Sequence, residues 1–241
     1  MVSLSVLSMS TRWKEMAGKG MSTMRELTKK EALLLESHRR WVEEKRPEKE
    51  KPSLAGIDLS DTDLRGACLY KAELYYANLT GTWLNNANLR EANLAGAVLE
   101  NAHLSEACLT SAYLDSASLE GSYLGRADLS KANLRRADLR NTDLAGANLY
   151  AANIGDTTLY QTNLENAHNV LTLGPIGSRL GLTYAVRHPK VIMIKCGCFW
   201  GTFEEWMERC REAHRGKGHA EAYAAAATFI RAYANSYWAG E

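Results

Sequence analysis

The sequence predicts a solenoid over residues 54–168, flanked by a shorter region on either side. Leucine occupies every fifth position from Leu59 to Leu164, with Ile154 as the single exception, in 22 consecutive units. A small residue, usually alanine, lies two positions before each of these except the first, where Ile57 stands. The period is lost on both sides of this stretch. A fixed internal period determines the architecture before any other feature of a sequence.

A period of five differs from the 3.6 residues of a helical turn and from the two-residue period of a strand. It is typical of a coil whose sides are five residues long. One large and one small side chain of each unit then point inward, and the other three face solvent. A leucine zipper is excluded, because the leucines do not follow a heptad.

Segments such as ADLSKANLRRADLRNTDLAGANL, residues 127–149, resemble the pentapeptide-repeat family, whose consensus is A(D/N)Lxx. The resemblance implies an all-β solenoid core, a right-handed quadrilateral β-helix with four units in each coil. The 22 units would then form about 5.5 coils, and a strand spacing of ~4.8 Å makes the rod about 26 Å long. Each buried leucine would contribute roughly 1.5–3 kcal/mol to its core.

Residues 1–53 are expected to form an N-terminal extension and a capping helix. Thr28 and Glu31 have the spacing of a capping box, and the helix is expected to end before Pro47. One face of this helix carries Leu34, His38 and Trp41. The ends of a solenoid would pair with other chains unless they were covered. We therefore expect the helix to cover the first coil, with His38 at the edge of the contact.

Residues 169–241 are expected to form a small C-terminal α+β cap with the order β-β-α-α. Two segments of alternating hydrophobicity, 180–186 and 192–198, predict the strands. A second capping box, Thr202 with Glu205, begins the first helix, and an alanine-rich helix follows. The motifs GPIGSR and CGCFWG in this region resemble the tails of phage and prophage pentapeptide-repeat proteins.

The composition is that of a soluble globular protein, with 46% hydrophobic residues, 24% charged residues and a net charge of +1. The net charge is −6 over the predicted rod, +4 before it and +3 after it. No run of 18 apolar residues is present, so we expect no membrane span. The segment MVSLSVLSMS lacks the features of a signal peptide, and Met1 and Met21 are both candidate starts. An odd number of cysteines, five, favours a reducing cytoplasm.

Four residues of the C-terminal region suggest a zinc site: Cys196, Cys198, Cys210 and His214. Cys210 and His214 lie one helical turn apart, which suits two ligands of one ion. Cys196 and Cys198, however, alternate with aliphatic residues, as small buried side chains do. We therefore expect no metal and no cofactor. GPIGSRLG lacks the pattern of a phosphate-binding loop and no nucleophile–histidine motif stands out, so we expect no enzymatic activity.

Two surface features of the rod are candidate protein-binding sites. Residues 20 apart stack in neighbouring coils, so the outward positions form four faces. One face has a net charge of −4, from Asp58, Asp61, Glu100, Glu120 and Asp138 against Arg140. On another face a column stacks Trp83, His103 and Tyr123. Such a column either stabilises the solenoid or anchors a partner, and both interpretations stay open.

These features favour a non-enzymatic protein-interaction module that binds a host or phage protein. Some members of the family resemble B-form DNA and bind DNA gyrase, so the resemblance implies a candidate partner that acts on nucleic acid, such as a topoisomerase. The charge limits this mimicry, because 26 Å of duplex would carry roughly 15 charges. We expect no direct contact with nucleic acid. The alternatives are a structural or assembly scaffold with the rod as a spacer, and a metal- or thiol-dependent activity of the C-terminal region.

The C-terminal region is expected to join two copies of the chain. One face of the last helix carries Tyr223, Ala227, Ile230, Ala234 and Tyr237. If that face covers the strands, the remaining aromatic side chains need separate cover, and two-fold dimers are the commonest soluble assembly. The candidate dimer contacts are Tyr223, Phe229, Ile230, Tyr233, Tyr237 and Trp238.

Overall fold

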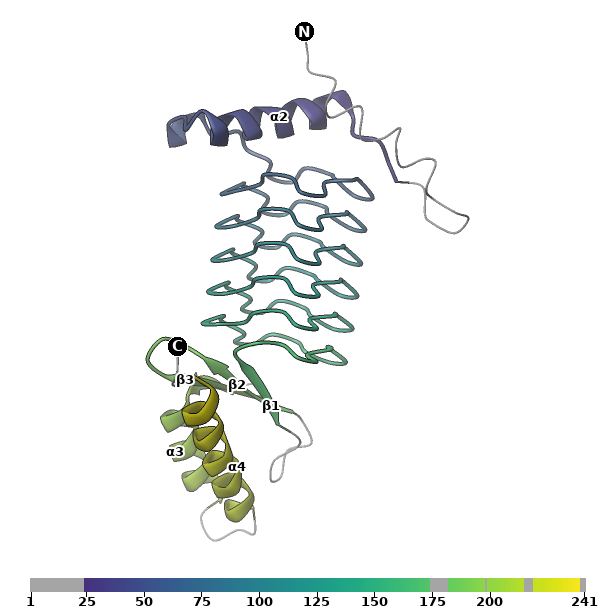
Figure 1. The fold of residues 1–241 in the computed structure, drawn as a ribbon. Helices are drawn as coiled ribbons and strands as arrows, with labels where there is room; N and C mark the ends of the chain where they lie inside the picture. Colours follow the sequence, from purple (N-terminus) through teal and green to yellow (C-terminus); the bar gives the residue numbers. More distant parts are fainter. Residues whose placement is uncertain (1–23, 174–181, 198, 215–218, 239–241) are drawn as a thin grey trace.

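The computed structural model describes residues 24–173, 182–197, 199–214 and 219–238. Its centre is a stack of rectangular coils (Figure 1). Helix α2 lies across one end of the stack, and a four-stranded sheet with helices α3 and α4 lies at the other. The GPIGSRLG loop, residues 174–181, and Cys198 fall outside the described residues.

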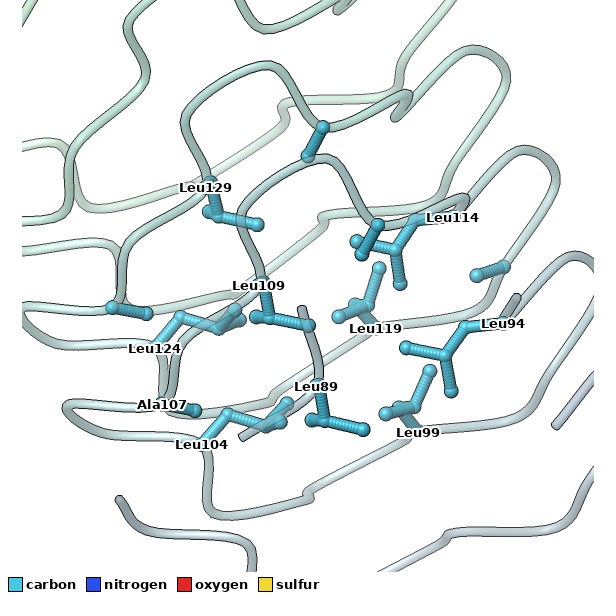
Figure 2. Packing of buried hydrophobic residues seen from close by; sticks show 14 of the residues in the cluster. Leu89, Leu94, Leu99, Leu104, Ala107, Leu109, Leu114, Leu119, Leu124 and Leu129 are labelled. Atoms are coloured by element: carbon cyan, nitrogen blue, oxygen red, sulfur yellow. The ribbon is translucent and has the colours of Figure 1, made fainter. Parts of the chain in front are cut away.

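The register of the coils confirms the five-residue period. Parallel bridges join residues 20 apart, from Ser53 with Glu73 to Asn148 with His168, so each coil has four sides of five residues. Leucine side chains from neighbouring coils point toward one another inside the stack (Figure 2). Leu54 is also buried, so the ladder begins one unit earlier than the sequence predicted.

Every corner of the coils uses a left-handed backbone conformation, a feature that the sequence analysis missed. The residue two positions after each inward leucine has a positive φ, at every fifth position from Gly56 to Asn166. A hydrogen bond closes most of the turns, as where the Ala67 N–H donates to the Leu64 carbonyl at 3.0 Å. This is the pattern of a type II turn. Only six of these corners are glycine, so the coil imposes the conformation on many other residue types.

Threonine and serine replace the small inward alanine without leaving a hydroxyl unpaired. The Thr82 Oγ1 donates to the Leu59 carbonyl of the previous coil at 2.7 Å, and the Ser122 Oγ donates to the Leu119 carbonyl at 2.6 Å. A buried hydroxyl without a partner would cost about 1–3 kcal/mol. The small position therefore tolerates these residues because a main-chain acceptor lies within reach.

The N-terminal cap is helix α2 (Lys29–Glu43), followed by the short helix η1 (Glu48–Glu50). The predicted capping box at Thr28 is confirmed in both directions. His38 is fully buried, which corrects its predicted place at the edge of the contact. Its Nε2 lies 3.2 Å from the Tyr70 carbonyl, and its ring packs against Trp41. The Tyr70 carbonyl of the first coil thus provides a hydrogen-bond acceptor for the buried His38 ring.

The C-terminal cap contains four strands where the sequence predicted two. They are β1 (Val170–Leu173), β2 (Thr183–Arg187), β3 (Ile192–Cys196) and β4 (Phe199–Thr202), antiparallel in the order β1-β2-β3-β4. The two missed strands, β1 and β4, are only four residues long and merge with the last coil and with the next helix. Each is too short to show an alternating pattern.

Strand β2 is buried on both faces, so it joins the rod to the C-terminal helices. Tyr184 and Val186 belong to the apolar core of the rod, whereas Ala185 belongs to the core between the sheet and the helices. The predicted alternation does place Tyr184 and Val186 on one face, but it did not indicate that the opposite face is buried as well. Its second face is occupied because the open end of the rod also needs apolar cover.

Helices α3 (Phe203–His214) and α4 (Ala220–Tyr233) pack on the sheet, and the π-helical turn η2 (Ala234–Trp238) extends α4. The predicted capping box at the start of α3 is confirmed, with Thr202 and Glu205 bonded to each other's main chain. Tyr237 is 69% exposed, which corrects its predicted place on the buried face. The wider turn of η2 rotates it away from the apolar stripe of α4. None of the described helices is both long and apolar enough to cross a membrane.

Candidate protein-binding surfaces of the rod

The aromatic strip consists of Trp83, His103 and Tyr123, which occupy one outward position in three successive coils. The Trp83 and His103 ring centroids are 4.6 Å apart, and those of His103 and Tyr123 are 4.9 Å apart with an interplanar angle of 10°. The Arg65 guanidinium lies 5.1 Å from the centroid of the Trp83 ring. The strip is therefore a stack of planar groups that runs along the rod.

The electrostatics of the strip suit an uncharged stack. Burial lowers the pKa of His103 below its ordinary value, so its ring is neutral near pH 7. Tyr123, at one end of the stack, is still 47% exposed. The packed rings support the stabilising interpretation of the column, and the exposed Tyr123 ring supports its use as a contact.

Ion pairs interrupt the predicted acidic face near the C-terminal end of the rod. Arg140 binds Glu120 at 2.8 Å and Asp138 at 2.6 Å. Its hydrogen bonds hold the pKa of Asp138 below the ordinary value. Glu100 accepts a hydrogen bond from the Ser118 hydroxyl at 3.0 Å. Glu120 and Asp138 are therefore paired with Arg140, and the carboxylates of this face do not form an unbroken acidic strip.

A second arginine, Arg25, lies at the start of the same face, where the sequence analysis placed none. Its side-chain Nη2 donates to the Asp58 carbonyl at 2.9 Å, and its main-chain N–H donates to the Asp61 carbonyl at 2.8 Å. Hydrogen bonds from Ser60, with a smaller contribution from Arg25, lower the pKa of Asp58. This corrects the expectation that Arg140 alone opposes the acidic residues. The segment before α2 brings a positive charge that the repeat pattern does not contain.

Three exposed tyrosines form a surface that the sequence analysis did not single out. They lie on the face opposite the aromatic strip, at outward positions of two units: Tyr75, Tyr76 and Tyr113. A hollow of about 460 Å³ beside Tyr113 is lined by charged residues that include Lys51, Glu73 and Asp115. Tyrosine is enriched in protein interfaces. The recurrence of tyrosine at outward positions was the signal available in the sequence.

Two cysteines of the C-terminal domain, Cys196 and Cys210, lie in its described part. Cys196 is buried, and its Sγ lies 3.4 Å from the Thr183 hydroxyl, which donates to it. Cys210 packs at the edge of the same apolar core. Across the described residues no group of three or more histidine, cysteine or acidic residues could hold a metal ion. The side chain of His214 lies outside the described part, as Cys198 does.

The candidate dimer contacts fall into two groups. Tyr223 and Ile230 are buried in the domain's own core, which corrects their assignment to a surface between copies. Phe229 and Tyr237 are exposed, and the Tyr233 ring stacks on the Tyr237 ring at 4.7 Å. Trp238 meets Tyr233 edge-on at 5.5 Å and packs partly on the core.

The family model for pentapeptide repeats matches residues 51–81, 72–110, 84–121, 107–146 and 127–166. The chain belongs to the pentapeptide-repeat family. Its rod is accordingly a right-handed quadrilateral β-helix, as the sequence predicted. No curated protein sequence matches the chain.

Several solved pentapeptide-repeat structures are similar to this chain. A trypsin-treated variant of QnrB1, a plasmid-mediated fluoroquinolone resistance protein, is 19% identical, with a TM-score of 0.45; the match covers 48% of this chain and 59% of that protein. A protein of the Arabidopsis thaliana thylakoid lumen is 28% identical, with a TM-score of 0.33 and coverage of 38% and 68%. HetL, from the cyanobacterium Nostoc, is 33% identical, with a TM-score of 0.26 and coverage of 47% and 68%.

Proposed function

We propose that this pentapeptide-repeat protein is a non-enzymatic module that binds a host or phage protein in a reducing cytoplasm. The observation that carries the proposal is the placement of large exposed aromatic side chains on a rod whose backbone is fixed in every coil. Tyr76 is 73% exposed and Tyr113 is 55% exposed, and Tyr123 projects from the opposite face. Aromatic side chains on a rigid support lose little entropy on binding, so they are effective anchors.

A pull-down with the immobilised full-length protein, followed by mass spectrometry, tests this proposal. We expect a protein from cell lysate to be retained by the wild type and lost with either Tyr113→Ala or Tyr123→Ala, according to the face it uses. Tyr160→Ala is the matched control, because Tyr160 is 66% exposed, more than Tyr113 or Tyr123, but lies on the acidic face. Retention of the same proteins by all three variants would contradict the use of the tyrosine surfaces.

A partner that acts on nucleic acid, such as a topoisomerase, is the narrower candidate. The carboxylates of the acidic face favour it, and the pairing of Arg140 with Glu120 and Asp138 weighs against it. An assay of supercoiling by purified DNA gyrase, with and without the protein, tests whether a topoisomerase is the partner. Under partial DNA mimicry the protein inhibits supercoiling, and Glu100→Gln relieves the inhibition. Unchanged supercoiling at micromolar protein would exclude this partner and leave other protein partners standing.

A scaffold that assembles through the C-terminal domain is the second candidate function. Phe229 and Tyr237 lie on an outward side of α4 and η2, and no charged residue lies between Glu221 and Arg231. An uncharged exposed face with aromatic side chains suits a second copy of the chain. Light scattering is expected to show a homodimer that Phe229→Asp converts to a monomer. A monomeric wild type at tens of micromolar would contradict this assembly.

A further inference from the structure

We propose that the end of the aromatic strip between Tyr123 and Asp143 is a docking notch for an arginine side chain of the protein partner. This inference rests on the proposed protein-binding function and adds the chemistry of one contact to it. The notch is defined by the Tyr123 ring on its side away from His103, the Asp143 carboxylate in the next coil, and the two small residues beside them, Gly125 and Ala145.

The other end of the strip contains the same interaction within the chain. Arg65 stacks on the Trp83 ring, while its Nη2 and Nε donate to the two carboxylate oxygens of Asp63 at 2.6 and 2.9 Å. Asp63 and Trp83 are bridge partners in neighbouring coils. A carboxylate one coil away from an aromatic ring thus holds a guanidinium over the face of that ring, which is the geometry that arginine favours.

Tyr123 and Asp143 repeat this pair in the reverse order, because they too are bridge partners in neighbouring coils. His103 stacks on one face of the Tyr123 ring. Within the described residues no ring or cation is recorded on its other face. The position that corresponds to Arg65, two residues after the aspartate, is Ala145. The chain therefore has the ring and the carboxylate at this end and lacks the arginine.

The charges around the notch favour a cation. The Asp143 Oδ1 accepts hydrogen bonds from the Ala145 N–H at 3.0 Å and the Asn163 Nδ2 at 2.8 Å. No lysine or arginine in the described part of the chain forms an ion pair with Asp143. The basic residues nearest to the notch in sequence have other partners: Arg126, near Tyr123, pairs with Glu106 at 3.6 Å, and Arg140, near Asp143, pairs with Glu120 and Asp138. Both hydrogen bonds to Asp143 end on Oδ1, and among the described residues no hydrogen bond to the second carboxylate oxygen accompanies them.

A guanidinium fits this notch better than an ammonium group. It is planar, so it can stack on Tyr123 and donate to Asp143 at the same time, whereas an ammonium acts as a point charge. Arg140 shows that an arginine beside one coil can contact two coils, because it binds Asp138 in its own coil and Glu120 in the previous one. The coil spacing therefore matches the reach of one arginine head group.

Titration of the full-length protein with the blocked peptide acetyl-Gly-Arg-Gly-amide, followed by NMR, tests the notch. We expect shifts at Tyr123, Asp143 and Ala145, and weaker binding of the matching lysine and citrulline peptides. Asp143→Asn should reduce the affinity about two- to fivefold, the range of one exposed ion pair. Asparagine occupies this position in other units, so the variant should fold. The matched control is Glu204→Gln, which removes an exposed charge from helix α3, outside the rod.

Ala145→Arg is the second variant, since it supplies the missing arginine from the chain itself. It is expected to shift the Tyr123 resonances and to abolish binding of the arginine peptide. Equal binding of the arginine and citrulline peptides would overturn the inference. So would an equal loss in Glu204→Gln, or unchanged binding in Ala145→Arg. If these peptide experiments fail while Tyr123→Ala still loses a captured protein, the arginine chemistry is wrong and the protein-binding function stands.

Discussion

The two ends of the rod are covered by different chemistry. In the first coil the carbonyls of Asp58, Ser60 and Tyr70 face no preceding coil. Side-chain donors from the N-terminal region reach them instead: Arg25 binds the carbonyls of Asp58 and Ser60, and the His38 ring binds that of Tyr70. At this end polar side chains thus bind the free main-chain carbonyls, while Leu27, Leu34 and Leu35 pack against the apolar core.

At the opposite end, main chain and apolar side chains close the stack. The Ala151 N–H has no following coil, and it donates to the Arg187 carbonyl of β2 at 2.6 Å. Tyr184 and Val186 from the same strand extend the leucine core. A stack of parallel coils presents different unpaired groups at its two ends, so each cap must supply the complementary group. The following predictions separate the rod from its caps.

Leu114→Asp is expected to have the largest effect, because it breaks the core that both caps share. Leu114 is fully buried in the middle of the stack. An unpaired carboxylate there should cost more than about 4 kcal/mol and abolish cooperative unfolding. Circular dichroism during heating measures this. The matched control is Tyr113→Asp at the neighbouring outward position, which should melt like the wild type. A cooperative native transition in Leu114→Asp would contradict the inward register.

Val186→Ala is expected to weaken the C-terminal cap alone. Val186 is fully buried against the rod, so losing two methyl groups should cost about 2–3 kcal/mol of unfolding free energy. Denaturant titration measures the change, and hydrogen exchange at the Ala151 N–H shows where it acts. Val191 is exposed, and Val191→Ala should change the stability by less than about 0.5 kcal/mol. Equal losses would show that β2 does not extend the core.

The N-terminal cap should lose stability in acid. Burial lowers the pKa of His38, and the nearby Lys51 lowers it further. A group with a depressed native pKa stabilises the fold fully above its unfolded pKa, ~6.5, and this stability is lost as the pH falls below that value. Stability should therefore decrease from pH 7 to pH 5.

His38→Gln separates the contribution of this cap from that of the other histidines. It should flatten the pH dependence only in part, since burial also lowers the pKa values of His103 and His188. Melting temperatures across this pH range provide the measurement. The same slope in the variant and the wild type would exclude His38 as a source of the acid sensitivity.

Ala151→Gly is expected to have the smallest effect and the opposite sign. Ala151 occupies a corner with a φ of 57°, a conformation that costs an L-residue about 1–2 kcal/mol. Glycine removes this cost, but its backbone loses more conformational entropy on folding than that of alanine. The net stabilisation should therefore be up to about 1 kcal/mol. Ala145→Gly, outside the left-handed corner, should destabilise by about 0.5–1 kcal/mol. If denaturant titrations gave both variants a change in unfolding free energy of the same sign, the proposed strain at the corner would be contradicted.

The sequence by itself determined the features that repeat or act locally. The spacing from Leu59 to Leu164 defined the coil and its inward side chains, because each unit meets the same neighbours 20 residues away. The capping boxes at Thr28 and Thr202 defined two helix starts, because their hydrogen bonds span only three residues. The stacking of Trp83, His103 and Tyr123 followed from the same register.

Only the tertiary structure decided what happens where the repeat meets other parts of the chain. The burial of His38, the contact of Arg25 with the acidic face and the two buried faces of β2 all depend on partners far away in the sequence. No local pattern encodes such contacts, because the same helix or strand could pack in several ways. The unpaired main-chain groups at the ends of the rod favour one of these packings. Those groups exist only once the coils have formed.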